Sequence, residues 1–151
     1  MNSKLWGTIT WLFFHTLAEK IDENKFEKVK VDVINIIILV CNNLPCPDCS
    51  NHATEVLKKA YISNIQSKKH LIEFLRQFHN IVNIKIGKQE FTKEEIKEKY
   101  KNNNLLLLLN NMINVYKSIK TSNRLMSYNL QRNINLNKLF LLMNNIKYAL
   151  L

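Results

Sequence analysis

Only two glycines and two prolines interrupt this chain of 151 residues, and their scarcity limits its possible folds more than any other feature. These residues form most tight turns, which β-sheet proteins need in large numbers. A turn-rich β fold is therefore disfavoured, and long helices are favoured. No stretch alternates apolar and polar residues strongly enough to build a sheet. The sequence predicts an all-α protein.

Apolar residues recur at helical spacings through the first hundred residues. We expect five helices there, over about residues 3–21, 25–42, 46–60 and 92–100 and between Ser67 and Gly87. Ser67 is a candidate N-cap, Gly87 a helix stop, and Thr92 begins a capping-box pattern. On the first helix we expect a buried stripe made of Leu5, Ile9, Leu12 and Leu17. The second helix is apolar nearly all round, which indicates deep burial or cover by a partner subunit.

The Lys-Asn-Asn-Asn stretch at residues 101–104 is the expected boundary between a domain over residues 1–104 and an extension over residues 105–151. The net charge of the chain is +10, and the extension carries six Lys or Arg and no acid. We expect it to form two helices separated by a loop over residues 121–135, packed on the core or on a partner subunit. The expected apolar stripes are Leu105, Leu108, Leu109, Met112, Ile113 and Tyr116, then Leu136, Leu139, Phe140, Met143 and Ile146 or Lys147. The competing interpretation is a detached cationic arm that binds nucleic acid or membrane.

The stretch Leu44-Pro45-Cys46-Pro47-Asp48-Cys49 places two thiols one helical turn apart at the start of the third helix. Pro47 suits the first turn of a helix, where its missing N–H costs nothing. Thiols at a helix N-terminus ionise readily because they lie at its positive end. We predict a redox-active pair, with Cys46 the more exposed sulfur and Cys49 packed further in. For Cys41 we expect a small buried hydrophobe, with a resolving or intersubunit thiol as the alternative.

Histidines and asparagines recur on the helices around this pair. Trp11 and His15 lie four residues apart on one helical face, and His79, Asn80 and Asn83 cluster on another helix. A histidine and two asparagines on a half-buried face are costly unless each finds a partner. This cluster favours a polar ligand that lies along the helix.

Three kinds of site compete for the Cys-x-x-C. A zinc site would use Cys46, Cys49 and two of the four histidines, but the sequence offers no second tight pair of ligands. A thioredoxin-like redox site would need strands around the motif, where this chain predicts helices. An all-helical thiol oxidase that couples the disulfide to a flavin accounts for the tryptophan, the histidines, the asparagines and the lysines together.

Over about residues 5–100 the chain resembles the Erv/ALR family of FAD-linked sulfhydryl oxidases. The matching pieces are, in order, Trp6-Gly7 with Trp11, His15, Thr16 and Leu17; Pro45-Cys46-Pro47-Asp48-Cys49 with His52; Phe78-His79-Asn80-Ile81-Val82-Asn83; and Lys85, Gly87-Lys88, Phe91 and Tyr100. A Cys-x-x-C alone is weak evidence, whereas several independent motifs in the expected order are strong evidence.

The resemblance implies a four-helix bundle that cradles FAD, with a short fifth helix. Cys49 would lie against the isoalloxazine and pass it electrons, and Cys46 would be attacked by the substrate thiol. The implied cofactor-binding residues are Gly7, Thr8, Trp11, His15, Cys49, His52, His79, Asn80, Val82, Asn83, Lys85, Lys88 and Tyr100, with no metal. Oxygen would be the final acceptor and hydrogen peroxide the product. A non-enzymatic thiol-exchange or zinc-binding module is the alternative.

The chain departs from the family at several positions. Thr8 stands where cellular relatives often carry Arg, and Arg76 and Lys93 stand where they often have a structural disulfide. With its compact core, the chain looks more like the versions of large DNA viruses. It shows no signal peptide or membrane-spanning run, so the expected location is the cytoplasm of an infected host cell or the virion. The expected partners are client protein thiols or a thioredoxin-like relay protein, oxygen, and a second copy in a homodimer.

Overall fold

The computed structural model describes residues 3–119 and 123–151. In that part of the chain, eight α-helices and four single-turn 3-10 helices are present, and the only β-pairing is an isolated bridge between Ile21 and Leu150. The α-helices are α1 (Ser3–Lys20), α2 (Phe26–Asn42), α3 (Pro47–Lys59), α4 (Lys68–Lys85), α5 (Lys93–Tyr100), α6 (Leu105–Ser118), α7 (Met126–Leu136) and α8 (Lys138–Ile146). The all-α prediction is confirmed.

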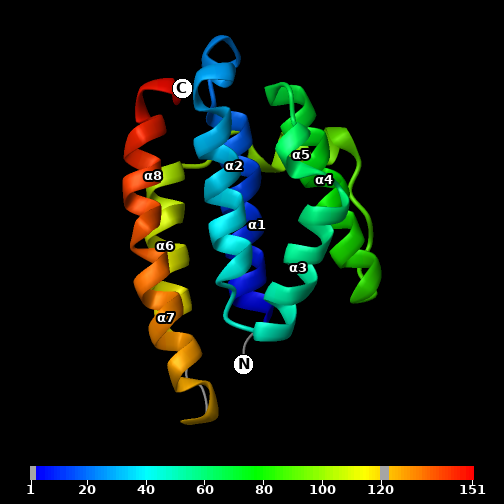
Figure 1. Ribbon diagram of the computed structural model, residues 1–151. Helices are drawn as coiled ribbons and strands as arrows, with labels where there is room; N and C mark the ends of the chain where they lie inside the picture. Colours follow the sequence, from blue (N-terminus) through cyan, green and yellow to red (C-terminus); the bar gives the residue numbers. More distant parts are fainter. Residues whose placement is uncertain (1–2, 120–122) are drawn as a thin grey trace.

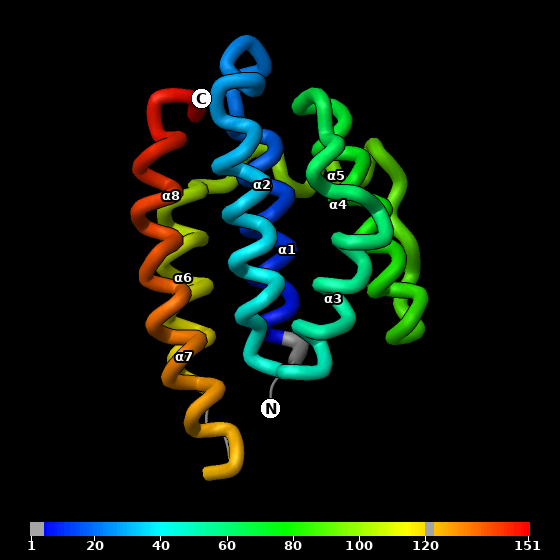
Figure 2. The backbone as a smooth tube through the Cα atoms, viewed as in Figure 1, coloured from blue at the N-terminus to red at the C-terminus, as the bar shows by residue number. Residues whose placement is uncertain are grey.

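Two helices, α1 and α2, occupy the middle of the molecule (Figure 1). The backbone trace shows α3, α4 and α5 on one side of them and α6, α7 and α8 on the other (Figure 2). α1 packs against α4, α5 and α6, while α2 packs against α3 and α8. The two central helices belong to the region that resembles the oxidase family. They carry the rest of that region on one side and the C-terminal extension on the other.

Local capping signals explain where the later helices of the core begin and end. Ser67 caps α4, because its Oγ accepts a hydrogen bond from the backbone N–H of His70 at 3.0 Å. Thr92 and Glu95 form a complete capping box at the start of α5. Gly87 follows the end of α4 with φ of 75°, in the left-handed region that glycine enters without strain. All three sequence signals are confirmed.

The buried face of α1 differs from the predicted stripe. Leu17 is buried, but Leu5 is 51% exposed, and Ile9 and Leu12 are only partly buried. The large side chains that enter the core from this helix are Trp6, Phe13 and Phe14, with Leu17. Because α4, α5 and α6 all pack on α1, its buried surface extends around the helix and follows the aromatic residues.

The extension contains three helices where two were predicted. The predicted loop over residues 121–135 is wrong from Met126 onward, where α7 begins; Thr121 and Ser122 lie outside the described residues. Arg132 and Leu136 lie one turn apart on α7 and are both buried. Burial of this face outweighs the weak helix propensity of its asparagines.

The predicted apolar stripes of the extension are confirmed at most positions. On α6, Leu108 is only partly buried, and the other five predicted residues are buried. On α8, Leu139, Met143 and Ile146 are buried, whereas Phe140 is 47% exposed and was wrongly placed in the stripe. Phe140 lies about 100° around the helix from Leu139, which carries it out of the buried face.

The extension packs closely on the core. The hydroxyls of Thr10 and Tyr116 are hydrogen-bonded, and the Tyr116 ring meets Trp6 edge-on with centroids 6.4 Å apart. At its end, Ala149 O accepts from the backbone N–H of Asp22 at 2.7 Å. The packed-helix prediction is confirmed for the described residues, and the detached arm is not observed there.

The extension covers much of the apolar surface of α2 from within the chain. The sequence argument for a partner subunit was that α2 is too apolar for a small bundle to cover. In the structure α8 packs along α2 and supplies that cover. This particular reason for a second copy is therefore removed.

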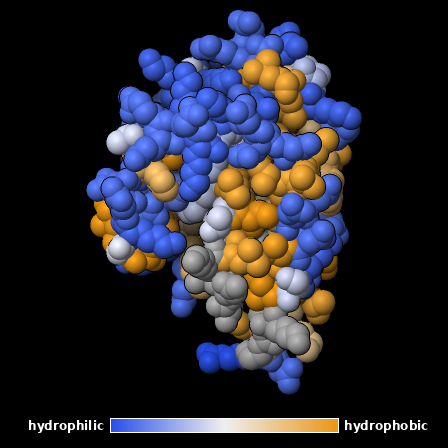
Figure 3. All heavy atoms as spheres, turned by 180° about the vertical axis from the view of Figure 1, so that it is seen from behind, coloured by the Kyte–Doolittle hydropathy of each residue, from blue (hydrophilic) through white to orange (hydrophobic). Residues whose placement is uncertain are grey.

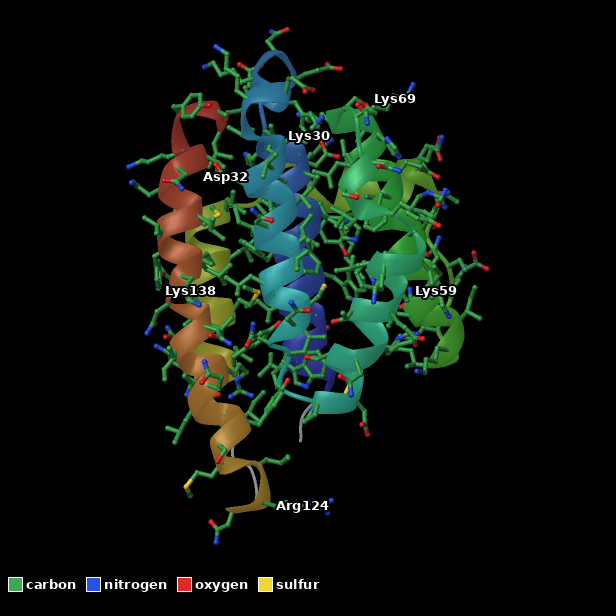
Figure 4. All side chains as sticks on the ribbon, viewed as in Figure 1. Lys30, Asp32, Lys59, Lys69, Arg124 and Lys138 are labelled. Atoms are coloured by element: carbon green, nitrogen blue, oxygen red, sulfur yellow. A yellow bond between two sulfur atoms is a disulfide. The ribbon has the colours of Figure 1, made fainter. Side chains whose placement is uncertain are left out.

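Apolar and charged side chains are distributed unevenly over the surface. The view from behind shows a broad apolar area on the side of the extension, and a mostly hydrophilic surface with smaller apolar patches elsewhere (Figure 3). Lys138 and Arg124 project outward from the extension (Figure 4), whereas Arg132 is buried. Among the described helices, none has the length and hydropathy needed to cross a membrane.

Candidate functional site

The two thiols of the Cys-x-x-C form a disulfide at the start of α3. Cys46 is the N-cap of this helix and Pro47 occupies its first turn, as predicted. The backbone N–H of Cys49 donates to Cys46 Sγ at 3.3 Å, so the sulfur takes the place of a capping oxygen. Both cysteines are partly buried and pack against the core, and the predicted difference in their exposure stays a prediction.

Four of the predicted cofactor residues form one aromatic stack built from α1, α4 and α5. The rings of Trp11 and His79 are nearly parallel, with centroids 4.1 Å apart. His15 Nε2 and His79 Nδ1 lie 2.9 Å apart and share a hydrogen bond. Tyr100 stacks on His15 with centroids 4.4 Å apart. The fold thus joins residues from three helices that are far apart in sequence.

The two stacked histidines are neutral at pH 7. Burial is the largest cause that lowers the pKa of His15 and of His79 to about 3, and the charge of Lys99 contributes to both shifts. The neutral state suits their shared hydrogen bond, since one ring nitrogen donates and the other accepts. Two protonated rings would direct two N–H groups at each other.

Asn80 and Asn83 find partners inside the chain. The Asn80 side chain accepts from Phe91 N at 2.7 Å and donates to Phe91 O at 3.0 Å. The Asn83 amide donates to Gln89 O at 2.9 Å. The sequence argument that these amides need a polar ligand is therefore incorrect, because they hold the α4–α5 connection. Their contact with a cofactor stays a prediction.

The remaining predicted residues come from α1, α3, α4 and the turn that follows α4. His52 on α3 is partly buried, and burial, then the charge of Lys85, lowers its pKa. Lys85 and Lys88 are exposed, and neither forms an ion pair with an acid of the described residues. Val82 packs partly buried against the core. Gly7 has open space beside it, since an added Cβ would meet no atom within 4 Å, and Thr8 is exposed.

Lys99 belongs to this region, although the sequence reasoning missed it. Its ammonium lies 5.0 Å from the centroid of the Phe91 ring and 5.5 Å from that of Tyr100. Such distances are typical of cation–π contacts. In the sequence Lys99 is one of several alternating charges on α5, so only its position directly before Tyr100 could have indicated it.

An ion-pair network occupies the positions where cellular relatives are expected to carry a disulfide. Glu73 lies 2.6 Å from Arg76 and 3.9 Å from Lys93, which begins α5. Arg76 also donates to Phe91 O at 3.0 Å. Glu73 therefore pairs with both expected cysteine positions, Arg76 on its own helix and Lys93 on α5.

The third cysteine does not take part in this site. Cys41 is 1% exposed on α2, and burial raises the pKa of its thiol. An undissociated, covered thiol is a poor nucleophile, which agrees with the packing interpretation. Among the described residues no three His, Cys, Asp or Glu side chains come together for a metal ion, so the zinc alternative has no ligand set there.

Comparisons with known proteins match the part of the chain that holds these residues. A model of the Erv1/Alr family matches residues 8–101. The chain is 31% identical to the FAD-linked sulfhydryl oxidase ERV1 of Arabidopsis thaliana over 90 residues, which cover 60% of this chain and 47% of that protein. It is 26% identical over 102 residues to a candidate FAD-linked sulfhydryl oxidase of Invertebrate iridescent virus 3, covering 67% and 69% of the two chains.

These matches differ in extent between the two kinds of relative. The chain spans about half the length of the plant relatives that it matches, and about two thirds of the iridovirus protein. The family match covers more than half of the present chain and includes the disulfide of α3 and the whole aromatic stack. The chain therefore belongs to the Erv1/Alr family.

Proposed function

We propose that this protein is an FAD-linked sulfhydryl oxidase that introduces disulfides into protein thiols. The observation that carries the proposal is the Cys46–Cys49 disulfide at the start of α3, inside the segment that matches the family. Relatives that share this segment are named FAD-linked sulfhydryl oxidases. A disulfide at the positive end of a helix is also chemically suited to thiol exchange.

The residues around the aromatic stack suit FAD. Trp11, His15, His79 and Tyr100 are flat rings that stack on one another, and rings of this kind can also stack on the ring systems of FAD. Lys85 and Lys88 have no acidic partner among the described residues, so both cations are available to a diphosphate. The other residues proposed to hold the cofactor are Gly7, Thr8, Cys49, His52, Asn80, Val82 and Asn83.

The reaction at sulfur uses Cys46 and Cys49. A substrate thiolate attacks Cys46 Sγ, the bond between the two cysteines breaks, and Cys49 leaves as a thiolate. The second substrate thiolate then attacks the substrate sulfur of the mixed disulfide and releases Cys46. Two electrons pass from the substrate to the cysteine pair. FAD, when bound, supplies two-electron redox chemistry with oxygen as the final acceptor and hydrogen peroxide as product.

The absorbance spectrum and oxygen uptake test this proposal. Purified protein should show flavin absorbance and should consume oxygen when dithiothreitol is added. Cys49→Ser and Cys46→Ser should each stop reduction by thiols, while Cys41→Ser should retain turnover because that thiol is buried. A colourless protein that cannot be reconstituted with FAD would contradict the proposal, and it would favour a non-enzymatic thiol-exchange module.

The partners and the assembly are proposed from the family and the site. The Cys46–Cys49 pair would oxidise client proteins directly or a thioredoxin-like relay protein. We retain a homodimer as a proposal, although α8 already covers α2. Light scattering at micromolar concentration tests it, and a monomer would contradict it. The cytoplasm of an infected cell, or the virion, is the proposed location.

A further inference from the structure

A tyrosine of the extension contacts residues on both sides of the Cys-x-x-C. Tyr128 Oη, on α7, donates a hydrogen bond to Leu44 O at 2.6 Å. The same oxygen lies 3.1 Å from Ser50 Oγ. Leu44 comes two residues before Cys46, and Ser50 directly follows Cys49. The tyrosine hydroxyl therefore contacts both sides of the Cys-x-x-C.

These contacts close a ring of three hydrogen bonds. The backbone N–H of Leu44 donates to Ser50 Oγ at 2.9 Å. Because Tyr128 gives its only proton to Leu44 O, the proton between the two hydroxyls comes from Ser50. Each hydroxyl then donates once and accepts once, and Leu44 uses both its N–H and its carbonyl. Leu44 and Ser50 are buried, so losing a member of the ring is costly.

A second contact from α7 reaches the same loop. The Asn135 amide donates to Asn43 Oδ1 at 3.0 Å, and the Asn43 amide donates to Leu39 O at 2.7 Å. α7 thus holds the chain directly before the Cys-x-x-C through two side chains, Tyr128 and Asn135. Both residues lie beyond the segment that matches the family.

We propose that Tyr128 is a positioning residue for the Cys46–Cys49 disulfide, supplied by the C-terminal extension. By tying Leu44 to Ser50, its hydroxyl keeps the two sulfurs close together and raises the effective concentration of one at the other. The closed disulfide gains more from this restraint than the open dithiol, in which the sulfurs separate. This inference rests on the proposed function only for the catalytic use of the disulfide. The positioning itself rests on the hydrogen bonds of Tyr128.

The consequence is measurable as a redox equilibrium. Reduced dithiothreitol gives two electrons and two protons to the pair: the Cys46–Cys49 bond breaks, and the cyclic disulfide of oxidised dithiothreitol forms. Without the Tyr128 hydroxyl, the equilibrium should move toward the protein dithiol by about threefold to tenfold, since two hydrogen bonds to the loop are lost. Tenfold corresponds to about 30 mV for a two-electron couple.

The experiment compares the full-length protein with Tyr128→Phe, which keeps the ring and removes only the hydroxyl. Each protein is equilibrated under nitrogen in dithiothreitol buffers of graded ratio. The free thiols of the peptide with Cys46 and Cys49 are then alkylated and quantified by mass spectrometry. Tyr148→Phe is the matched control, because Tyr148 is 56% exposed elsewhere on the extension. A protein without flavin still gives this result, so a failure of the proposed function is seen separately.

A shift toward the dithiol in Tyr128→Phe, with Tyr148→Phe equal to wild type, supports the proposal. Ser50→Ala should shift the equilibrium in the same direction, because it removes another member of the ring. If Tyr128 merely stabilised the fold, its substitution would lower the melting temperatures of the disulfide and dithiol forms equally and would leave the redox equilibrium unchanged. An equilibrium within twofold of wild type in both Tyr128→Phe and Ser50→Ala overturns the proposal.

Discussion

Acidification should destabilise this protein through the His15–His79 pair. Burial holds the pKa of each imidazole at about 3 in the folded chain, against an ordinary value of 6.5. Between these values the unfolded chain binds protons that the folded chain does not bind. The stability that the pair contributes is therefore complete above pH 6.5 and is lost as the pH falls toward 3.

The magnitude follows from the two pKa values. A pH of 5 lies about 1.5 units below the ordinary pKa of a histidine in the unfolded chain. Each pH unit corresponds to about 1.4 kcal/mol. Going from pH 7 to pH 5 should therefore lower the free energy of unfolding by about 2 kcal/mol for each of His15 and His79. Against a typical total of about 5–15 kcal/mol, the loss from both histidines is a large fraction of the stability.

Urea unfolding followed by circular dichroism at pH 7, 6 and 5 measures this loss. FAD is kept at one fixed concentration, because a ligand of the folded state adds to its stability. His79→Gln should be less stable than wild type at pH 7 but should lose about 2 kcal/mol less on going to pH 5. His70→Gln changes an exposed histidine of α4 and serves as the control. If wild type and His79→Gln lose the same free energy between pH 7 and 5, the reasoning is refuted.

Three other outcomes are expected. Truncation after Tyr100 should lower the melting temperature sharply, because α6 and α8 cover α1 and α2; an unchanged melting curve would contradict the packing of the extension. Asn80→Ala should cost about 2 kcal/mol in urea unfolding, since both hydrogen bonds to the Phe91 backbone are lost. Glu73→Gln should cost about 1 kcal/mol at pH 7 by weakening the pair with Arg76, which holds the pKa of Glu73 below its ordinary 4.5. That difference should shrink as the pH falls below about 4.5, because the unfolded chain then binds a proton at Glu73 that the folded chain does not yet bind, and a constant difference would contradict the ion-pair explanation.

Part of the candidate site could be predicted because it depends on interactions between residues that are close in sequence. The disulfide at the start of α3 follows from Pro47 and from the spacing of Cys46 and Cys49, which together set a helix start and a turn between two sulfurs. Helix starts such as that of α5 depend on side chains three residues apart. Such interactions need no knowledge of what packs nearby, so the sequence contains them in full.

The partners of polar residues could not be predicted in the same way. The sequence indicated that Asn80 and Asn83 need hydrogen bonds, but not that Phe91 and Gln89 supply them. It gave no sign that Lys99 would lie over two aromatic rings. Which polar groups meet depends on how the α4–α5 connection folds back, and that path is set by packing.

By itself, the sequence determined the all-α fold, the starts of α3, α4 and α5 and the place of the Cys-x-x-C, because glycine content, capping and helical spacing act between near neighbours. Only the tertiary structure decided the third helix of the extension, the buried face of α1 and the contact of Tyr128 with Leu44. Tyr128 and Leu44 are separated by 84 residues. A contact over such a distance forms because α7 and α8 pack on α2, and that arrangement depends on the burial of many side chains at once.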